Sequence, residues 1–219
     1  MNIQENVSLK PYNTFGVDAK AKRYINVESI DTLQSVLSQN KDNSLFILGG
    51  GSNMLLTRDI DALVIHLNLK GISIVKEQDN TIIIEAKAGE NWHDFVQYCI
   101  KNNYGGIENL SLIPGNVGTA PIQNIGAYGV ELKDVFHSCT AVNIETQELK
   151  NFNKSDCKFG YRESVFKQEL KGKFIITSVC FQLTVNEHKL NTSYGAISSQ
   201  LEDFGIDKPT ICDISWDQR

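Results

Sequence analysis

The chain has 219 residues, of which 41% are hydrophobic and 21% charged, an ordinary balance for a globular protein with room for two small domains or one large one. Its formal net charge of -5 argues against nucleic acid as a partner, because proteins that bind phosphate backbones normally carry a basic surface. The first residues show no basic stretch followed by an apolar one, so we expect no secretory signal and a cytoplasmic location. Five scattered cysteines without C-x-x-C spacing favour reduced thiols, and we expect no metal site.

Residues 1–68 show the pattern of a small αβ unit. Its predicted elements are a strand at 23–27, a helix that Ser29 caps, and buried strands at 45–48 and 63–67. The helix places apolar residues at positions 30, 33, 36 and 37, on one face.

Residues 69–210 show the pattern of a second unit, and residues 211–219 resemble the first turns of a further helix. The second unit's predicted elements are strands at 72–75, 81–88, 140–144 and 174–183, and a helix that begins after Asn91 and is closed by Gly105. His93 lies on the polar face of this helix, where we expect it to be solvated.

A glycine-rich turn, Gly49-Gly50-Gly51-Ser52-Asn53, directly follows the predicted strand at 45–48, where ligand crevices form in αβ folds. It does not match the dinucleotide fingerprint, whose third glycine would fall at Met54, and no Gly-Lys-Ser/Thr follows as in a Walker loop. Its backbone N–H groups and short side chains can still bind a phosphate. A tight turn without a ligand explains the glycines equally well.

Residues 109–130 contain no charged side chain, yet glycine, proline and polar residues make the segment unsuitable for a bilayer. A surface loop of this length would carry charge, whereas a buried one must satisfy its backbone groups. We predict that residues 113–129 wrap a flavin nucleotide. N–H groups near Thr119 would bind its diphosphate without a lysine, and its ring would lie against Ile122 and the Gln123 and Asn124 amides. A buried irregular connection is the alternative.

Arg162 stands in a third segment of interest, Phe159-Gly160-Tyr161-Arg162-Glu163-Ser164. A guanidinium can hold a carboxylate bidentately or stabilise a developing enolate. An exposed Tyr–Arg pair with a surface ion pair is the alternative reading.

Taken together, four segments resemble the UDP-N-acetylenolpyruvoylglucosamine reductase family of flavoenzymes. They are residues 49–53, Gly-Glu-Asn-Trp-His at 89–93, residues 113–129, and Gly-Tyr-Arg at 160–162. Residues 9–16 also resemble the family's N-terminal signature, and the likeness runs in order from residue 8 to residue 194. The resemblance implies an α+β, vanillyl-alcohol-oxidase-type FAD-binding fold of two αβ subdomains, 1–68 and 69–210.

The resemblance also implies an activity. An FAD-dependent oxidoreductase of this family uses NADPH to reduce, through bound FAD, the enolpyruvyl group of a UDP-sugar to UDP-N-acetylmuramate during peptidoglycan synthesis. Arg162 matches the catalytic arginine, and Tyr128, Tyr161, Tyr194 and Arg219 match substrate-contacting positions. The implied cofactor-binding residues are Gly49, Gly50, Gly51, Ser52, Asn53, Ile113, Pro114, Gly115, Gly118, Thr119, Ile122, Gln123, Asn124, Gly126 and Ala127.

The family pattern continues into a third, substrate-binding domain that holds a serine proton donor and a late glutamate. We expect that domain to be missing here, with residues 211–219 as its shortened start, and the chain to be inactive or weakly active alone. The resemblance further implies a monomer, a UDP-sugar enolpyruvyl substrate, and no membrane or nucleic-acid partner.

Two other hypotheses stay open. A non-catalytic flavin- or nucleotide-binding module would carry the same pocket but need not accept a hydride from NADPH. A Rossmann-type nicotinamide dehydrogenase is disfavoured by the failed fingerprint at Met54.

Overall fold

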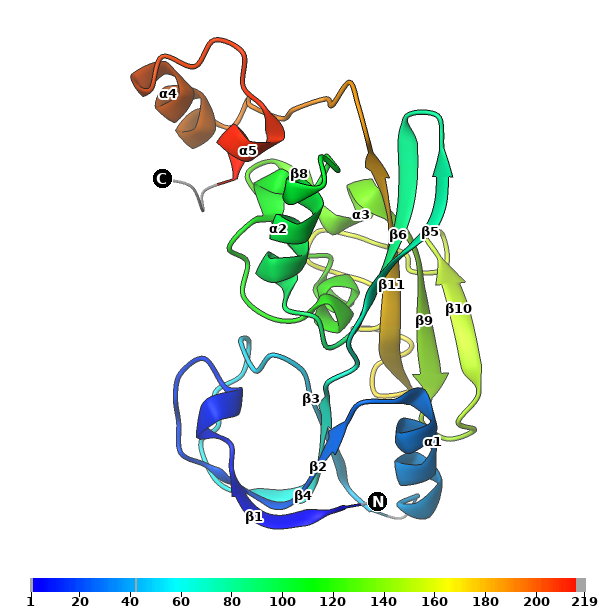
Figure 1. The fold of residues 1–219 in the computed structure, drawn as a ribbon. Coiled ribbons are helices and arrows are strands. Elements are labelled where there is room, and N and C mark those ends of the chain that lie inside the picture. Colours follow the sequence, from blue (N-terminus) through cyan, green and yellow to red (C-terminus); the bar gives the residue numbers. More distant parts are fainter. Residues whose placement is uncertain (1, 42, 216–219) are drawn as a thin grey trace.

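The computed structural model describes residues 2–41 and 43–215. It contains two main β-sheets, one formed by strands before residue 68 and one formed by strands after it (Figure 1). The first sheet has the order β1-β2-β4-β3 and consists of β1 (Gln4–Ser8), β2 (Lys20–Val27), β3 (Leu45–Leu48) and β4 (Ile60–Leu67). β4 runs parallel to both β2 and β3, while β1 pairs antiparallel with β2. A short 3₁₀ helix, η1 (Lys10–Tyr12), follows β1.

Helix α1 (Ile30–Gln39) makes the crossover between β2 and β3 and forms where the sequence predicts it. The Ser29 hydroxyl caps it by accepting a hydrogen bond from the Thr32 N–H at 3.1 Å. Leu33, Val36 and Leu37 are buried beneath it, so the apolar face that the sequence indicates is the face that packs.

The second sheet is antiparallel and has the order β10-β9-β11-β6-β5. Its strands are β5 (Ile72–Gln78), β6 (Thr81–Lys87), β9 (Phe136–Asn143), β10 (Leu149–Asn153) and β11 (Phe174–Thr184). The central strand β11 pairs with β6 on one side and β9 on the other. The predicted strands at 81–88, 140–144 and 174–183 are thereby confirmed, and 149–153 adds an edge strand that was not predicted.

Helix α2 (Trp92–Lys101) begins as predicted, because Asn91 caps it by accepting from the Asp94 N–H at 3.1 Å. Its predicted end at Gly105 is wrong. The helix closes at Asn102, whose N–H donates to the carbonyl oxygens of Tyr98 and Cys99. Gly105 instead exchanges backbone hydrogen bonds with Thr184, which extends the pairing of β11.

The remaining elements are short. They are η2 (Glu108–Leu110), η3 (Val117–Gln123), β7 (Gly126–Ala127), β8 (Val130–Glu131), α3 (Leu132–Val135), α4 (Gly195–Asp203) and α5 (Ile211–Ile214). The uncharged segment 109–130 therefore contains the end of η2, the whole of η3 and most of the β7–β8 hairpin, and it lies beside the second sheet (Figure 1). The helix predicted for 211–219 is present at Ile211–Ile214, and residues 216–219 lie outside the described residues.

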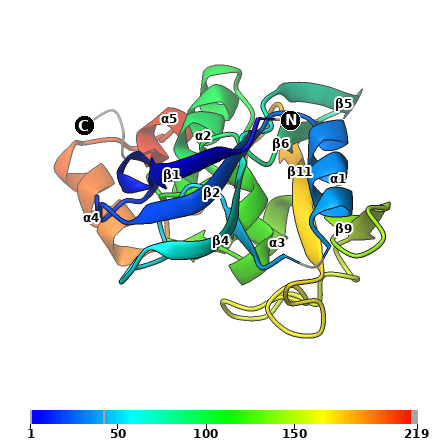
Figure 2. The same ribbon diagram turned by 90° about the horizontal axis from the view of Figure 1, so that it is seen from below.

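The two sheets share hydrophobic core. The cluster beneath α1 contains Val142 of β9 and Ile175 of β11 together with Ile65 of β4. Seen from below, α1 lies next to β11 (Figure 2). A larger cluster covers the second sheet, where the rings of Trp92, Phe95 and Phe181 pack with centroids 4.8–6.0 Å apart. The shared cluster beneath α1 contains residues from both sides of residue 68. The predicted division into two subdomains at residue 68 stays a prediction.

His66 of β4 gives the fold a pH-dependent contact. Its Nδ1 lies 2.8 Å from the Tyr24 hydroxyl, and its ring centroid lies 4.8 Å from that of Tyr12. Burial, with a smaller contribution from Lys70, lowers the pKa of the His66 imidazole. The unfolded chain therefore binds a proton at His66 more readily than the folded one.

We expect the free energy of unfolding to fall as the pH drops below about 6.5, the ordinary pKa of histidine, and His66→Gln to reduce that dependence. Urea unfolding at pH 7.5, 6.5 and 5.5 measures it. His137→Gln, at an exposed position of β9, is the matched control and should keep the wild-type slope. Equal pH dependence in His66→Gln and the wild type would contradict the assignment.

Candidate functional site

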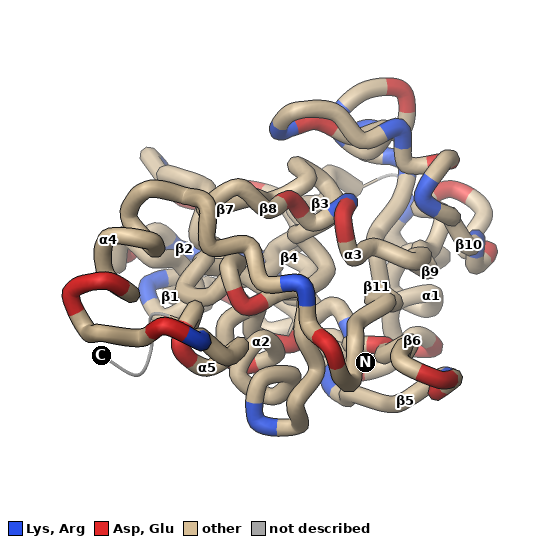
Figure 3. Tube along the Cα trace, turned by 90° about the horizontal axis from the view of Figure 1, so that it is seen from above, with Lys and Arg blue, Asp and Glu red and all other residues tan. Residues whose placement is uncertain are grey.

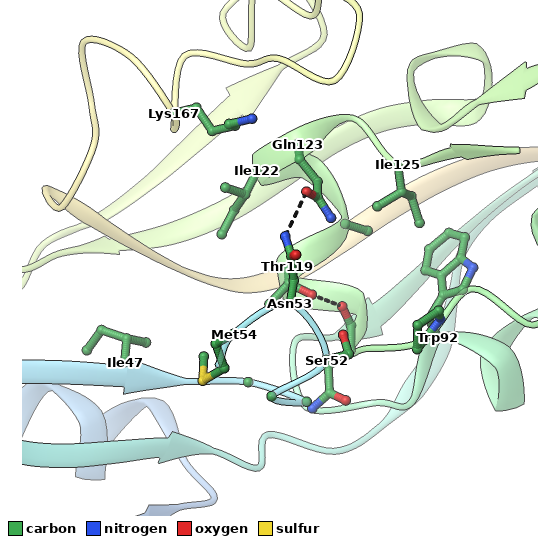
Figure 4. Close-up of a pocket in the computed structure, with 16 residues that line it drawn as sticks. Ile47, Ser52, Asn53, Met54, Trp92, Thr119, Ile122, Gln123, Ile125 and Lys167 are labelled. Carbon is green, nitrogen blue, oxygen red and sulfur yellow. Dashed lines mark hydrogen bonds between the residues drawn. The ribbon is translucent and has the colours of Figure 1, made fainter. Parts of the chain in front are cut away.

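A cavity of about 320 Å³ lies between the turn after β3 and the segment that carries η3 (Figure 4). Its wall combines glycine backbone with small polar and apolar side chains. The lining residues are Ile47, Gly49, Gly50, Gly51, Ser52, Asn53, Met54, Trp92, Pro114, Asn116, Thr119, Ala120, Ile122, Gln123, Ile125 and Lys167. The structure thus brings together two segments that the sequence analysis selected separately.

Glycine is required in the turn because backbone from two other segments touches it. Gly51 has φ +60, and a Cβ on it would lie 1.9 Å from the Tyr12 carbonyl oxygen. A Cβ on Gly50 would lie 2.9 Å from the Gly115 Cα. The turn can therefore approach η1 and the uncharged segment only without side chains at these positions.

Polar side chains join the two walls of the cavity. The Asn53 Nδ2 donates to the Gln123 Oε1 at 3.2 Å, across the space between the turn and η3 (Figure 4). The Thr119 hydroxyl donates to the Asn116 carbonyl oxygen at 2.7 Å, which fixes the first turn of η3. The predicted residues Gly49–Asn53, Pro114, Thr119, Ile122 and Gln123 all lie on this wall.

The turn offers backbone donors to a ligand. Within the described part of the chain, no hydrogen bond takes up the N–H groups of Gly50, Ser52 or Asn53. Donors at a partly enclosed site need an acceptor, and successive N–H groups of a glycine turn favour an anion. A diphosphate therefore fits the residues present.

A second cavity, of about 220 Å³, adjoins the first and has a mainly apolar wall. Its lining residues are Ile47, Gly49, Leu67, Ala88, Gly118, Thr119, Ile122, Ile144, Phe166, Gly172, Phe174, Ile175 and Ile176. Ile47, Gly49, Thr119 and Ile122 line both cavities, so the two spaces meet at the turn and η3. Gly118 belongs to this second wall, where a Cβ would lie 2.5 Å from the Ala88 Cβ.

Five predicted cofactor residues do not line either cavity. The Gly115 backbone lies against Gly50, and Ile113 packs against the core of the second sheet. Gly126 and Ala127 form β7. Asn124 is fully buried: its Nδ2 donates to the Gly160 carbonyl oxygen at 2.9 Å, and its Oδ1 accepts from the Lys133 N–H at 3.0 Å. The prediction that the Asn124 amide faces the cofactor is therefore wrong for this structure, in which it ties two loops together.

Arg162 lies beside the β7–β8 hairpin. It has φ +54, and its Nη2 donates to the Gly126 carbonyl oxygen at 2.6 Å. Tyr128 follows β7 and meets Tyr194 edge to face, with ring centroids 5.4 Å apart. Tyr161 is 86% exposed. Arg219 lies outside the described residues, so its predicted role stays untested.

Two residues differ from what the sequence suggested about charge and solvation. A phosphate site without a lysine was considered plausible, and Lys167 lines the first cavity. His93 was expected to be solvated, but it is half-buried and its Nδ1 accepts a hydrogen bond from the Leu112 N–H at 3.1 Å. This bond holds Leu112 at φ +60, a conformation that is strained for a leucine, at the start of the uncharged segment.

Trp92 and Asn116 also line the first cavity, although neither was predicted as a site residue. Trp92 belongs to the 89–93 motif, which was noted only as part of the resemblance, and its Nε1 donates to the Leu110 carbonyl oxygen at 2.8 Å. Its indole is 1% exposed, which is typical of a core residue that also closes a cavity. Asn116 lies inside the uncharged segment, so the segment's position could have indicated it.

All five cysteines are free thiols, and burial raises the pKa of Cys99. Within 2–41 and 43–215, no three His, Cys, Asp or Glu side chains are grouped to hold a metal ion. In the same ranges no helix has the length and apolar character to cross a bilayer. Lys and Arg are interspersed with Asp and Glu along the trace (Figure 3).

The chain is similar to known FAD-binding proteins. The family model described as "FAD binding domain" matches residues 21–151, and the chain belongs to that family. The chain is 61% identical over 215 residues to a UDP-N-acetylenolpyruvoylglucosamine reductase of Flavobacterium johnsoniae, and 49% identical over 217 residues to that of Pseudomonas syringae pv. tomato. Each match covers 98% of this chain and 64% or 63% of the relative. The resemblance to this reductase is confirmed.

Solved structures support the same fold. The Thermus caldophilus enzyme of that name has a TM-score of 0.67 at 22% identity, over 96% of this chain and 71% of that chain. A solvent-stable cholesterol oxidase has a TM-score of 0.60 at 17% identity, over 80% of this chain and 37% of that chain. The predicted α+β, vanillyl-alcohol-oxidase-type FAD-binding fold is confirmed.

Gly51→Ala tests the backbone contact on which the first cavity depends. We expect a loss of at least about 2 kcal/mol of unfolding free energy, because the left-handed conformation and the contact with Tyr12 both oppose a Cβ. Gly205→Ala is the matched control, with φ +65 and nothing within 4 Å, and should cost only about 1 kcal/mol. Urea unfolding measures both; equal losses would contradict the contact.

Proposed function

We propose that this chain binds FAD in the two joined cavities, and that the protein carries out the NADPH-dependent reduction of the enolpyruvyl group of UDP-N-acetylglucosamine enolpyruvate to UDP-N-acetylmuramate. The product is a precursor of peptidoglycan. The observation that carries the proposal is the 61% identity, over 98% of the chain, to a UDP-N-acetylenolpyruvoylglucosamine reductase. The chain spans 64% of that relative, so the activity of the whole protein is part of the proposal.

The cavities support FAD over a smaller flavin. The first cavity presents the free N–H groups of Gly50, Ser52 and Asn53, which suit a diphosphate. The second is lined by Leu67, Phe174 and other apolar side chains, which suit a planar adenine. Since Thr119 and Ile122 line both spaces, one dinucleotide can occupy them together.

Bound FAD would supply hydride acceptance from NADPH and hydride delivery to the substrate double bond. The protein's part is to bind, orient and stabilise charge. Arg162 is the candidate residue for stabilising the negative charge that develops on the substrate carboxylate during reduction. A guanidinium has five N–H donors, and the Gly126 carbonyl oxygen uses only one of them. That bond also fixes the guanidinium beside β7.

The aromatic pair on the same side would contact the sugar nucleotide. Tyr194 is 49% exposed and its ring packs at 86° against that of Tyr128, so about half of the Tyr194 side chain remains accessible to a ligand. Tyr161, Gly126 and Ala127 complete the proposed surroundings of Arg162. We further infer a cytoplasmic monomer, in keeping with a small UDP-sugar as the substrate.

A ligand series tests the cofactor. The purified protein, stripped of flavin, should bind FAD at least ~10-fold more tightly than FMN or riboflavin, because only FAD places a ring in the apolar cavity. Quenching of flavin fluorescence gives the dissociation constants. FMN binding as tightly as FAD would exclude the second cavity as the adenine site. Bleaching of the flavin absorbance by NADPH would then separate a reductase from a non-catalytic flavin-binding module.

Arg162→Ala tests the catalytic role. In the whole protein, flavin loading should stay within about twofold of the wild type, while reduction of the enolpyruvyl sugar should slow by about 10²–10³-fold. Stopped-flow measurement of substrate-dependent flavin reoxidation gives the rate. Arg162→Lys is the control that keeps the charge but loses the planar donor fork, and we expect partial activity. Wild-type rates in Arg162→Ala would remove this residue from the mechanism.

A further inference from the structure

Lys167 stands out in the first cavity. It contributes the charged side chain to a wall that is otherwise glycine backbone, small polar groups and apolar side chains. An FAD diphosphate carries two negative charges, and the free N–H groups of the turn supply only partial positive charge. The cavity therefore combines neutral donors with one full positive charge.

The chain fixes the position of this lysine from both sides. The buried Ser164 hydroxyl donates to the Ile122 carbonyl oxygen at 2.6 Å, which ties the loop between β10 and β11 (residues 154–173) to η3. The Lys167 N–H bonds to the Ser164 carbonyl oxygen at 3.0 Å, and Nζ donates to the Arg162 carbonyl oxygen at 2.9 Å. These bonds hold the ammonium at the edge of the cavity, on the side opposite Ser52 and Met54 (Figure 4).

The ammonium keeps donors for a ligand. An ammonium has three N–H groups, and the Arg162 carbonyl oxygen uses one. No carboxylate in residues 2–41 and 43–215 forms an ion pair with Lys167, and the neighbouring Glu163 accepts from Gln168 instead. Lys167 thus differs from Lys158 of the same loop, which pairs with Glu169 at 2.9 Å.

The location indicates which part of a dinucleotide would meet this charge. Phe166, the residue before Lys167, lines the apolar cavity, and Lys167 lines the polar one. Ile122, to which the loop is tied, lines both. Lys167 therefore lies on the first cavity close to residues that line the second, so the diphosphate of a ligand that fills both spaces would lie near it.

We propose that Lys167 is the electrostatic anchor of the FAD diphosphate, binding it from the side opposite the Gly49–Asn53 turn. This inference rests on the proposed binding of FAD. It assigns Lys167 a role in cofactor retention, with no part in hydride transfer. In this proposal the positive charge of the Lys167 ammonium binds the diphosphate, and contacts of its aliphatic stem alone are not enough.

FAD titration of the flavin-free protein tests the inference. Lys167→Met should weaken FAD binding by at least ~10-fold, the effect expected for losing a hydrogen-bonded charge. The variant should also show a shallower dependence of affinity on salt concentration, since one ion pair is gone. Lys167→Arg should restore most of the affinity. Lys171→Met, an exposed lysine of the same loop that lines neither cavity, is the matched control and should behave as the wild type.

Each outcome separates this inference from the proposed function. If the wild type fails to bind FAD, the proposed function falls and Lys167 falls with it. If the wild type binds FAD and Lys167→Met binds it equally well, only the anchor is overturned. Weaker FAD binding with an unchanged salt dependence would show that the lysine stem contributes and its charge does not, which would also overturn the electrostatic anchor. An unchanged affinity with an altered flavin midpoint potential would place Lys167 at the ring and also overturn the anchor.

Discussion

Close backbone contact between the Gly49–Asn53 turn and two other segments is the constraint on which the rest of this site depends. Gly51 touches Tyr12 of η1, and Gly50 touches Gly115 and Asn116 of the uncharged segment. Side chains at these positions would push the first sheet away from η3 and open the cavity. The glycines therefore serve two purposes, since they let the segments meet and they leave N–H groups at the cavity wall that have no hydrogen-bond partner among the described residues.

The second consequence is electrostatic. The segment 109–130 can be free of charge because its polar groups bond within the protein, as Asn109 does to the carbonyl oxygens of Tyr128 and Asn191. A neutral wall binds an anion through dipoles alone only weakly in water, so a fixed positive charge at its edge adds to retention. Lys167 occupies that edge while Arg162, five residues earlier, faces the β7–β8 hairpin. One loop thus serves the proposed cofactor and the proposed substrate.

Local patterns predicted the regular elements well. Ser29 and Asn91 cap the helices that the sequence indicated, and the apolar runs at 45–48 and 174–183 became strands, the first half-buried except at Leu48 and the second mostly buried. The failures occurred where distant residues decide. Gly105 resembles a helix end, but pairing with Thr184 takes its backbone groups into the sheet. The Asn124 amide was expected at the cofactor, but bonds to Gly160 and Lys133 turn it inward.

The sequence by itself determined the family, the fold class and the two glycine-bearing segments of the site, because these depend on short motifs and on residue-by-residue periodicity. Only the tertiary structure decided which side chains face the cavity. Lys167, Phe174 and Ile175 lie far along the chain from Trp92 and from the two glycine-bearing segments, and no local pattern relates them. Their meeting follows from how the two sheets pack over the shared core beneath α1, which is a property of long-range contacts.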